Sequence, residues 1–118
     1  MYTLEQQKAN RKLWVEALRS GKYEQGRGRL RRLDNYCCLG VLADVAGCAW
    51  SKATDGRWKS ERHTFDAPAL ARDFVGLSQG EGSFGDTCLT GINDSGKSFS
   101  EIADIIESEP PGLFRETA

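Results

Sequence analysis

Arginines gathered in one short stretch are the residues of this chain best suited to do chemistry. Between Lys22 and Arg32, arginines occupy positions 27, 29, 31 and 32, and glycines occupy positions 26 and 28. An extended backbone would send the side chains of Arg27, Arg29 and Arg31 to one side, because side chains alternate along a strand. Guanidinium groups bind phosphate through paired hydrogen bonds, so this stripe predicts an anion-binding surface.

Aromatic and amide side chains flank the stripe and would complete a ligand site. Tyrosine rings offer stacking surfaces and a glutamine offers amide hydrogen bonds, while an Asn-Asp pair near the C-terminal end could close the pocket. Asp94 would then orient Arg27 or Arg29; the alternative is that Asn93 and Asp94 only build a turn. The predicted site residues are Tyr23, Gln25, Arg27, Arg29, Arg31, Tyr36, Asn93 and Asp94.

A purely solvated surface is the competing interpretation of the arginine stretch. Glu24 and Asp34 flank it closely enough to neutralise part of its charge. The glycines of the chain also lack the spacing of either standard phosphate-binding loop. The arginines alone therefore do not decide between a ligand site and an ordinary charged face.

Enzymatic chemistry would have to come from cysteine. Cys37 or Cys38 could act as a nucleophile with His63 as the base, since such pairs meet in space and not in sequence. A cysteine inside an apolar helix is desolvated, however, which raises the pKa of its thiol and makes it inert. A zinc site from these residues with Cys48 or Cys88 would lack any CxxC pair. The prediction is a non-enzymatic protein without a metal or cofactor.

Several local patterns predict the elements that carry these residues. Capping boxes at Thr3–Gln6 and at Ser98–Glu101 predict the starts of two helices. Apolar residues from Cys38 to Val45 recur with helical spacing, and Gly47 can end that helix. Gly40 inside it predicts close packing against another backbone.

The middle of the chain gives weaker patterns. Asp55-Gly56 predicts the turn of a hairpin. Asp66 is expected to cap a short helix that has Pro68 in its first turn and ends at Gly76. Residues 78–85, rich in glycine, are expected to form a mobile loop.

These elements predict an α+β fold. We expect one domain over residues 1–118, with three or four short helices around one or two small β-hairpins. A frayed tail is expected over residues 112–118; the alternative is that Leu113 and Phe114 dock onto the domain. The expected core consists of Trp14, Leu18, Leu39, Val41, Leu42, Val45, Phe74, Ile102, Ile105 and Ile106.

Composition limits the classes of partner. The chain carries 16 basic and 17 acidic residues, for a net charge of −1, which argues against general nucleic-acid binding. The segment SFSEIADIIE is typical of the first helix of a helix-turn-helix, but Pro110-Pro111 follows where a recognition helix would have to begin. No apolar run approaches the roughly 20 residues that cross a bilayer, and no signal peptide is evident. A cytosolic protein without membrane contact is expected, and self-association stays open.

Three blocks of sequence resemble a family of small bacteriophage proteins. The blocks are WVEALRSGKYEQ from Trp14, YCCLGVL from Tyr36, and LTGINDSGKSFSEIADII from Leu89, and they cover 37 of the 118 residues. The resemblance implies an accessory protein made in the cytosol of the host bacterium, active in counter-defence or host takeover. Such a protein would sequester a phosphate-bearing small molecule through the arginine surface, or inhibit a host protein complex by binding it directly.

Overall fold

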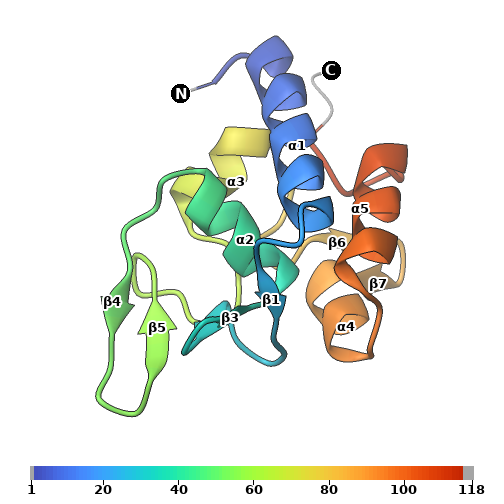
Figure 1. Ribbon diagram of the computed structural model, residues 1–118. Helices are drawn as coiled ribbons and strands as arrows, with labels where there is room; N and C mark the ends of the chain where they lie inside the picture. The colour runs from blue at the N-terminus through green and yellow to red at the C-terminus, as the bar shows by residue number, and fades with distance from the viewer. Residues whose placement is uncertain (1, 116–118) are drawn as a thin grey trace.

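The computed structural model describes residues 2–115 and confirms the α+β class. Helices form most of the body of the molecule, and a small sheet lies against one end of it (Figure 1). Within the described residues the helices are α1 (Leu4–Arg19), α2 (Cys38–Val45), α3 (Ala69–Val75), α4 (Leu89–Asp94) and α5 (Phe99–Ser108).

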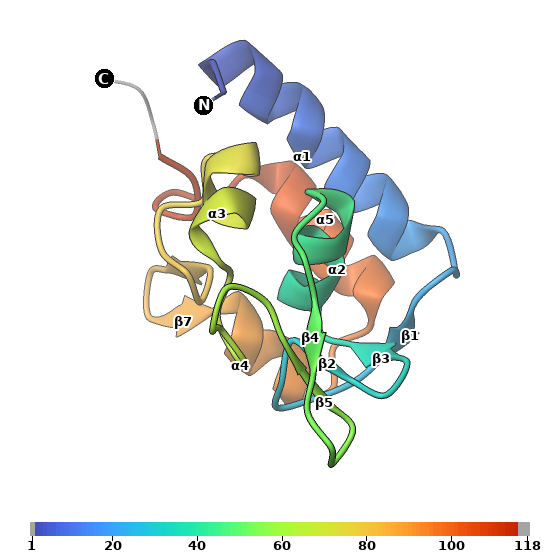
Figure 2. The ribbon, with the colours of Figure 1, turned by 90° about the vertical axis from the view of Figure 1, so that its left-hand side faces the viewer.

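The larger sheet is built from very short strands in the order β1-β3-β2-β5-β4. Its strands are β1 (Glu24–Gln25), β2 (Arg31–Arg32), β3 (Asn35–Tyr36), β4 (Ser51–Lys52) and β5 (Arg57–Lys59). Only the β1–β3 pair is parallel. The β4–β5 hairpin, with Gly56 at φ +85° in its turn, extends away from the helices (Figures 1 and 2).

Both predicted capping boxes are present. The Thr3 hydroxyl accepts a hydrogen bond from the amide of Gln6 at 3.1 Å, and the Ser98 hydroxyl accepts one from Glu101 at the same distance. The prediction that Asp66 caps α3 is wrong, because Pro68 occupies the N-cap position and has no side-chain hydrogen bond there. The Asp66 carboxylate instead lies 2.8 Å from His63 Nδ1, which removes it from the helix end.

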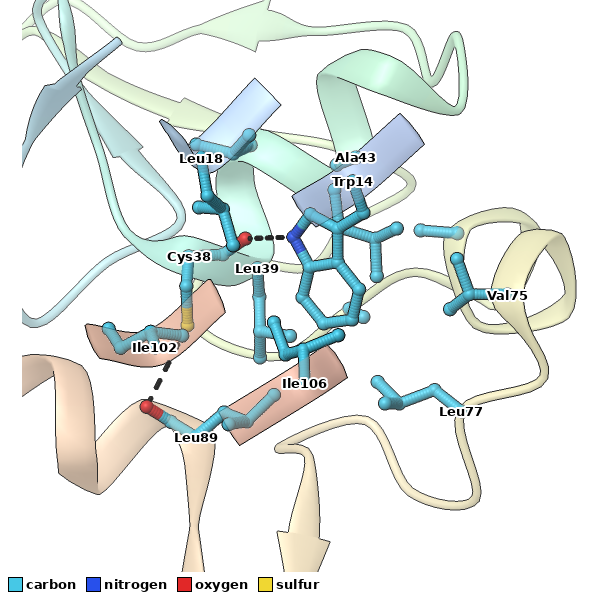
Figure 3. Close-up of a cluster of buried hydrophobic side chains, with 14 of the residues drawn as sticks. Trp14, Leu18, Cys38, Leu39, Ala43, Val75, Leu77, Leu89, Ile102 and Ile106 are labelled. Atoms are coloured by element: carbon cyan, nitrogen blue, oxygen red, sulfur yellow. Dashed lines mark hydrogen bonds between the residues drawn. The ribbon is translucent and has the colours of Figure 1, made fainter. Parts of the chain in front are cut away.

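Helix α2 lies at the centre of the core, surrounded by α1, α3 and α4. A Cβ atom on Gly40 would lie 1.8 Å from the carbonyl oxygen of Leu30, so the expected close packing against another backbone is confirmed. The indole of Trp14 donates to the Cys38 carbonyl at 3.0 Å, and the Cys38 thiol donates to the Leu89 carbonyl (Figure 3). These two bonds join α1, α2 and α4 inside an apolar cluster.

Most of the expected core is buried, with two exceptions. Val45 and Ile105 are only half-buried. Several leucines that local patterns did not mark are fully buried, and these are Leu30, Leu77, Leu89 and Leu113.

The end of the chain packs onto the body as far as the structure describes it. Leu113 is fully buried and Phe114 nearly so, and the Ser78 hydroxyl donates to the Leu113 carbonyl at 2.9 Å. The expected frayed tail is therefore wrong for residues 112–115, while residues 116–118 lie outside the described part of the chain.

Two further segments differ from expectation. The predicted mobile loop over residues 78–85 contains β6 (Ser83–Phe84), which forms a hairpin with β7 (Thr87–Cys88). Helix α4 forms over Leu89–Asp94, where the sequence predicted no helix but only a turn that begins at Asn93. Both segments are held by the buried side chain of Leu89, which packs against the backbone at Gly82, so that tertiary contacts override the local composition.

No helix of residues 2–115 is long and apolar enough to pass through a membrane.

Candidate functional site

The arginine stretch does not form the predicted stripe. Of its four arginines, only Arg31 and Arg32 lie in a strand, because Gly28 adopts φ +77° and turns the chain between residues 26 and 30. Arg27 extends toward Gly96, Arg29 lies over the ring of Phe65, and Arg31 lies among aromatic rings. Arg27, Arg29 and Arg31 therefore lie in three separate environments and do not form the single surface that was predicted.

Asn93 fixes the loop that carries these arginines. Its side chain is completely buried. The amide oxygen accepts hydrogen bonds from Gln25 Nε2 at 3.0 Å and from the Cys38 amide at 3.2 Å, and the amide nitrogen donates to the Gly26 carbonyl at 2.8 Å. Asn93 and Gln25 therefore act as an internal junction between α4, α2 and the arginine loop, and not as exposed ligand contacts.

Asp94 bonds the same loop from outside. Its Oδ1 accepts a hydrogen bond from the Gly28 amide at 2.9 Å. Asn93 and Asp94 are the last two residues of α4, and the predicted turn follows directly, since the Gly96 amide donates to the Asn93 carbonyl at 3.3 Å. No ion pair joins Asp94 to Arg27 or Arg29 among the described residues, but Asp94 and Arg29 do line one hollow.

This hollow, here called the Arg29 hollow, has a volume of about 260 Å³. The Arg29 guanidinium lies 4.9 Å from the centre of the Phe65 ring, whose residue is 53% exposed. The lining residues are Gly28, Arg29, Cys37, Phe65, Glu81, Thr90 and Asp94. Phe65, Glu81 and Thr90 were missed from the sequence, because they lie far from the arginines along the chain and no local pattern marks them.

The polar groups of the Arg29 hollow set its chemistry. Arg29 supplies hydrogen-bond donors and a positive charge, while Glu81 and Asp94 supply carboxylates that, when ionised, only accept. A bare inorganic anion would meet two negative charges for one positive charge. The hollow therefore suits a ligand that combines an anionic group with hydroxyl or amino donors.

The remaining predicted residues form an aromatic cluster on the sheet. The Arg31 guanidinium lies 3.9 Å from the ring centre of Trp58 and 4.9 Å from that of Tyr36, and Trp50 lies 5.5 Å away. Tyr23 packs edge-on against Tyr36. The side chain of Arg31 is only 16% exposed, so it supports the sheet more than it offers a free cation.

Asp44 anchors the aromatic cluster to α2. The Tyr23 hydroxyl donates to Asp44 Oδ2 at 2.6 Å, and Trp50 Nε1 donates to Oδ1 at 3.2 Å. Burial, together with the hydrogen bond to the Asp44 carboxylate, raises the pKa of the Tyr23 phenol well above its ordinary value. Tyr23 therefore stays protonated and keeps donating throughout the physiological range.

Charge is divided unevenly along the chain. Residues 22–64, which carry the whole larger sheet, hold nine basic and five acidic residues, for a net charge of +4. The rest of the chain holds the other seven basic and twelve acidic residues, for a net charge of −5. The overall value of −1 therefore conceals a basic sheet region, where an anionic partner would be attracted.

The cysteines lie in environments that suppress their reactivity. Burial raises the pKa of the Cys37 thiol to about 11 and that of Cys38 well above its ordinary value. Cys37 Sγ accepts a hydrogen bond from the Gly40 amide at the start of α2. No group of three His, Cys, Asp or Glu residues in the part of the chain described here is arranged to hold a metal ion.

Comparison with known proteins gives one match. A family model described as a domain of unknown function, DUF8296, matches residues 6–78. This range covers α1 from Gln6 onward, the larger sheet, α2 and α3, and ends before α4. No curated protein and no solved structure matches the chain.

Proposed function

The chain belongs to the DUF8296 family, and we propose that it is a non-enzymatic protein that captures a phosphate-bearing, nucleotide-like small molecule in the Arg29 hollow. The observation that carries the proposal is the meeting of one guanidinium, one exposed aromatic ring and two carboxylates around a single hollow. The phosphate would bind Arg29, and a base would stack on the exposed ring of Phe65. Glu81 and Asp94 would accept hydrogen bonds from sugar hydroxyl or base amino groups.

The size of the hollow supports a small ligand. Its volume of about 260 Å³ lies just below the range of roughly 300–1,000 Å³ typical of ligand pockets. A mononucleotide would extend partly into solvent along Phe65. Because the Asn93 junction holds Gly26 and Asp94 holds Gly28, the loop that carries Arg29 is fixed before the ligand binds, which lowers the entropic cost of binding.

Sequestration fits the chemistry better than turnover. Among residues 2–115, the thiol that lines the hollow belongs to Cys37, whose pKa of about 11 leaves almost none of it ionised at neutral pH. The resemblance of three sequence blocks to small bacteriophage proteins supports a role in counter-defence or host takeover in the bacterial cytosol. A protein that binds a nucleotide signal without degrading it would lower the free concentration of that signal by an amount set by the concentration of the protein.

Thermal unfolding in the presence of nucleotides tests the proposal. A panel of linear and cyclic nucleotides should contain at least one member that stabilises the protein, by about 2.7 kcal/mol when present at one hundred times its dissociation constant. Inorganic phosphate should have little effect, because it has no base to stack on Phe65 and its charge is repelled by the carboxylates of Glu81 and Asp94. A flat response across the whole panel would rule out the small-molecule function.

Two arginine variants give a matched comparison. Arg29→Gln should abolish the stabilisation by the nucleotide, whereas Arg32→Gln removes an exposed arginine that does not line the hollow and should preserve it. Equal loss in both variants would mean that the effect is general charge attraction and not binding in the hollow.

A further inference from the structure

Phe65 lies between the arginine loop and the segment that leads into the β6–β7 hairpin. On one side, the Thr64 carbonyl accepts a hydrogen bond from the Leu30 amide at 2.7 Å. On the other side, the Ala67 amide donates to the Gly80 carbonyl at 2.8 Å. The ring that offers the stacking surface of the Arg29 hollow is thus attached by backbone hydrogen bonds on both of its sides.

Glu81 directly follows the second of these attachment points. The Thr90 amide donates to the Glu81 carbonyl at 3.3 Å, where the β6–β7 hairpin lies beside α4 (Figures 1 and 2). Glu81 is exposed and forms no ion pair and no side-chain hydrogen bond among residues 2–115. Both oxygens of its carboxylate are therefore open to a ligand that stacks on the neighbouring ring of Phe65.

Asp94, the other carboxylate of the hollow, is already partly engaged. Its Oδ1 accepts a hydrogen bond from the Gly28 amide at 2.9 Å and another from Asn93 Nδ2 at 3.3 Å. Of the two carboxylates that line the hollow, Glu81 is thus the one that can offer both oxygens to a single group of the ligand.

An ionised carboxylate only accepts hydrogen bonds, so it distinguishes the nucleobases by their donors. Guanine carries two adjacent donors on one edge, N1–H and the N2 amino group, and these match the two oxygens of one carboxylate. Adenine and cytosine place a ring-nitrogen lone pair beside their amino group, and uracil places a carbonyl oxygen on each side of N3–H. Each of these three bases would bring an acceptor against the carboxylate of Glu81.

We propose that Glu81 makes the Arg29 hollow selective for guanine nucleotides, an inference that rests on the proposed function because it takes from it the phosphate on Arg29 and the base on Phe65. The N1–H and N2 amino groups of guanine donate to the two oxygens of Glu81 while the base lies on the Phe65 ring. Asp94, which has one oxygen bonded to Gly28, takes a single donor such as a ribose hydroxyl.

Isothermal titration calorimetry of the intact chain with nucleoside 5′-monophosphates tests the selectivity. Guanosine monophosphate should bind at least about tenfold more tightly than inosine monophosphate, which lacks only the N2 amino donor. It should exceed adenosine monophosphate, which turns a lone pair toward Glu81, by at least the same factor. 2′-Deoxyguanosine monophosphate keeps the base and the 3′-hydroxyl and should bind within about threefold of guanosine monophosphate. The 3′,5′-cyclic forms, titrated in parallel, should give the same order of bases.

Two acidic residues of one hairpin region give matched variants. Glu81→Gln should weaken guanosine monophosphate at least about tenfold and bring its affinity within about threefold of that of adenosine monophosphate, because an amide offers the donor and the acceptor that adenine requires. Asp86→Asn makes the same change of charge in the exposed turn between β6 and β7, outside the hollow, and should leave both affinities within about twofold. Neither change should alter the unfolding temperature of the free protein.

The outcomes separate this inference from the proposed function. Equal binding of guanine and adenine nucleotides, or a guanine preference that persists in Glu81→Gln, would overturn the selectivity and leave nucleotide capture intact. Loss of affinity in the 2′-deoxy nucleotide but not in inosine monophosphate would assign Glu81 to the ribose instead of the base. A flat response to every nucleotide would overturn both proposals.

Discussion

At the scale of single residues, Asn93 makes the contacts on which the candidate site depends. Its amide joins Gln25, the Cys38 amide and the Gly26 carbonyl within a completely buried position. Few other side chains combine a donor and an acceptor in this geometry, because aspartate lacks the donor and leucine lacks both. The residue that sequence analysis placed in a ligand site is therefore the one that holds the site together.

Replacing Asn93 should destabilise the protein strongly. Asn93→Ala leaves the Cys38 amide and the Gly26 carbonyl without their partners, and each buried unsatisfied group costs about 1–3 kcal/mol. We expect a loss of about 2–4 kcal/mol in the free energy of unfolding, measured by urea titration. Ser100→Ala on the exposed face of α5 is the control and should change stability by less than about 0.5 kcal/mol.

The cysteines provide a prediction with a pH dependence. Since burial raises the pKa of Cys37 to about 11 and that of Cys38 well above its ordinary value, both thiols should resist alkylation by iodoacetamide at neutral pH. Cys88, only half-buried, should be labelled first. Labelling of Cys37 should accelerate as the pH rises toward about 11. Rapid, selective labelling of Cys37 or Cys38 at neutral pH, followed by mass spectrometry, would instead revive the enzymatic alternative.

At the scale of elements, two glycines inside helices should respond to the same substitution with opposite signs. Gly40→Ala in α2 would place a Cβ 1.8 Å from the Leu30 carbonyl oxygen, so α2 must separate from the arginine loop, at a cost of at least about 1–3 kcal/mol. Gly91→Ala in α4 would meet only Cys88 Sγ, at 3.4 Å. Because alanine favours helix over glycine, this variant should gain up to about 1 kcal/mol. Calorimetric unfolding temperatures of both variants would check the signs.

Elements with local determinants could be predicted from the sequence, and those held by distant contacts could not. Thr3 and Ser98 open their helices through residues three positions away, so their capping boxes were visible in the sequence. Helix α4 and the β6–β7 hairpin depend on Leu89, which packs against Gly82. Composition alone suggested a loop over residues 78–85 and a turn that begins at Asn93. The prediction of an arginine stripe was wrong for the same reason. Gly28 turns the chain and donates its amide hydrogen bond to Asp94, and no local pattern in the sequence reveals that Asp94 lies there.

At the scale of the whole molecule, one buried arginine ties the two ends of the described chain together. Arg11 of α1 donates through Nε to the Val75 carbonyl at 2.7 Å and through Nη1 to Glu109 at 3.1 Å. Its guanidinium also lies 3.9 Å from the ring centre of Phe114. One side chain thus satisfies a carbonyl at the end of α3 and holds the segment that follows α5.

This arrangement predicts energetic coupling between residues more than one hundred positions apart. Arg11→Ala should lower the free energy of unfolding by about 2–4 kcal/mol, because it removes a buried group that makes two hydrogen bonds and packs on the Phe114 ring. Phe114→Leu keeps an apolar side chain but removes the aromatic face, and the two changes together should cost less than the sum of the single changes. The difference should be about 0.5–2 kcal/mol, as expected for a stacked cation that is shielded from water. Lys12→Ala combined with Phe114→Leu is the matched control, since Lys12 is exposed and adjacent to Arg11 in sequence, and its effects should be additive. Additive effects for the Arg11 pair would mean that the terminal segment docks through Leu113 alone.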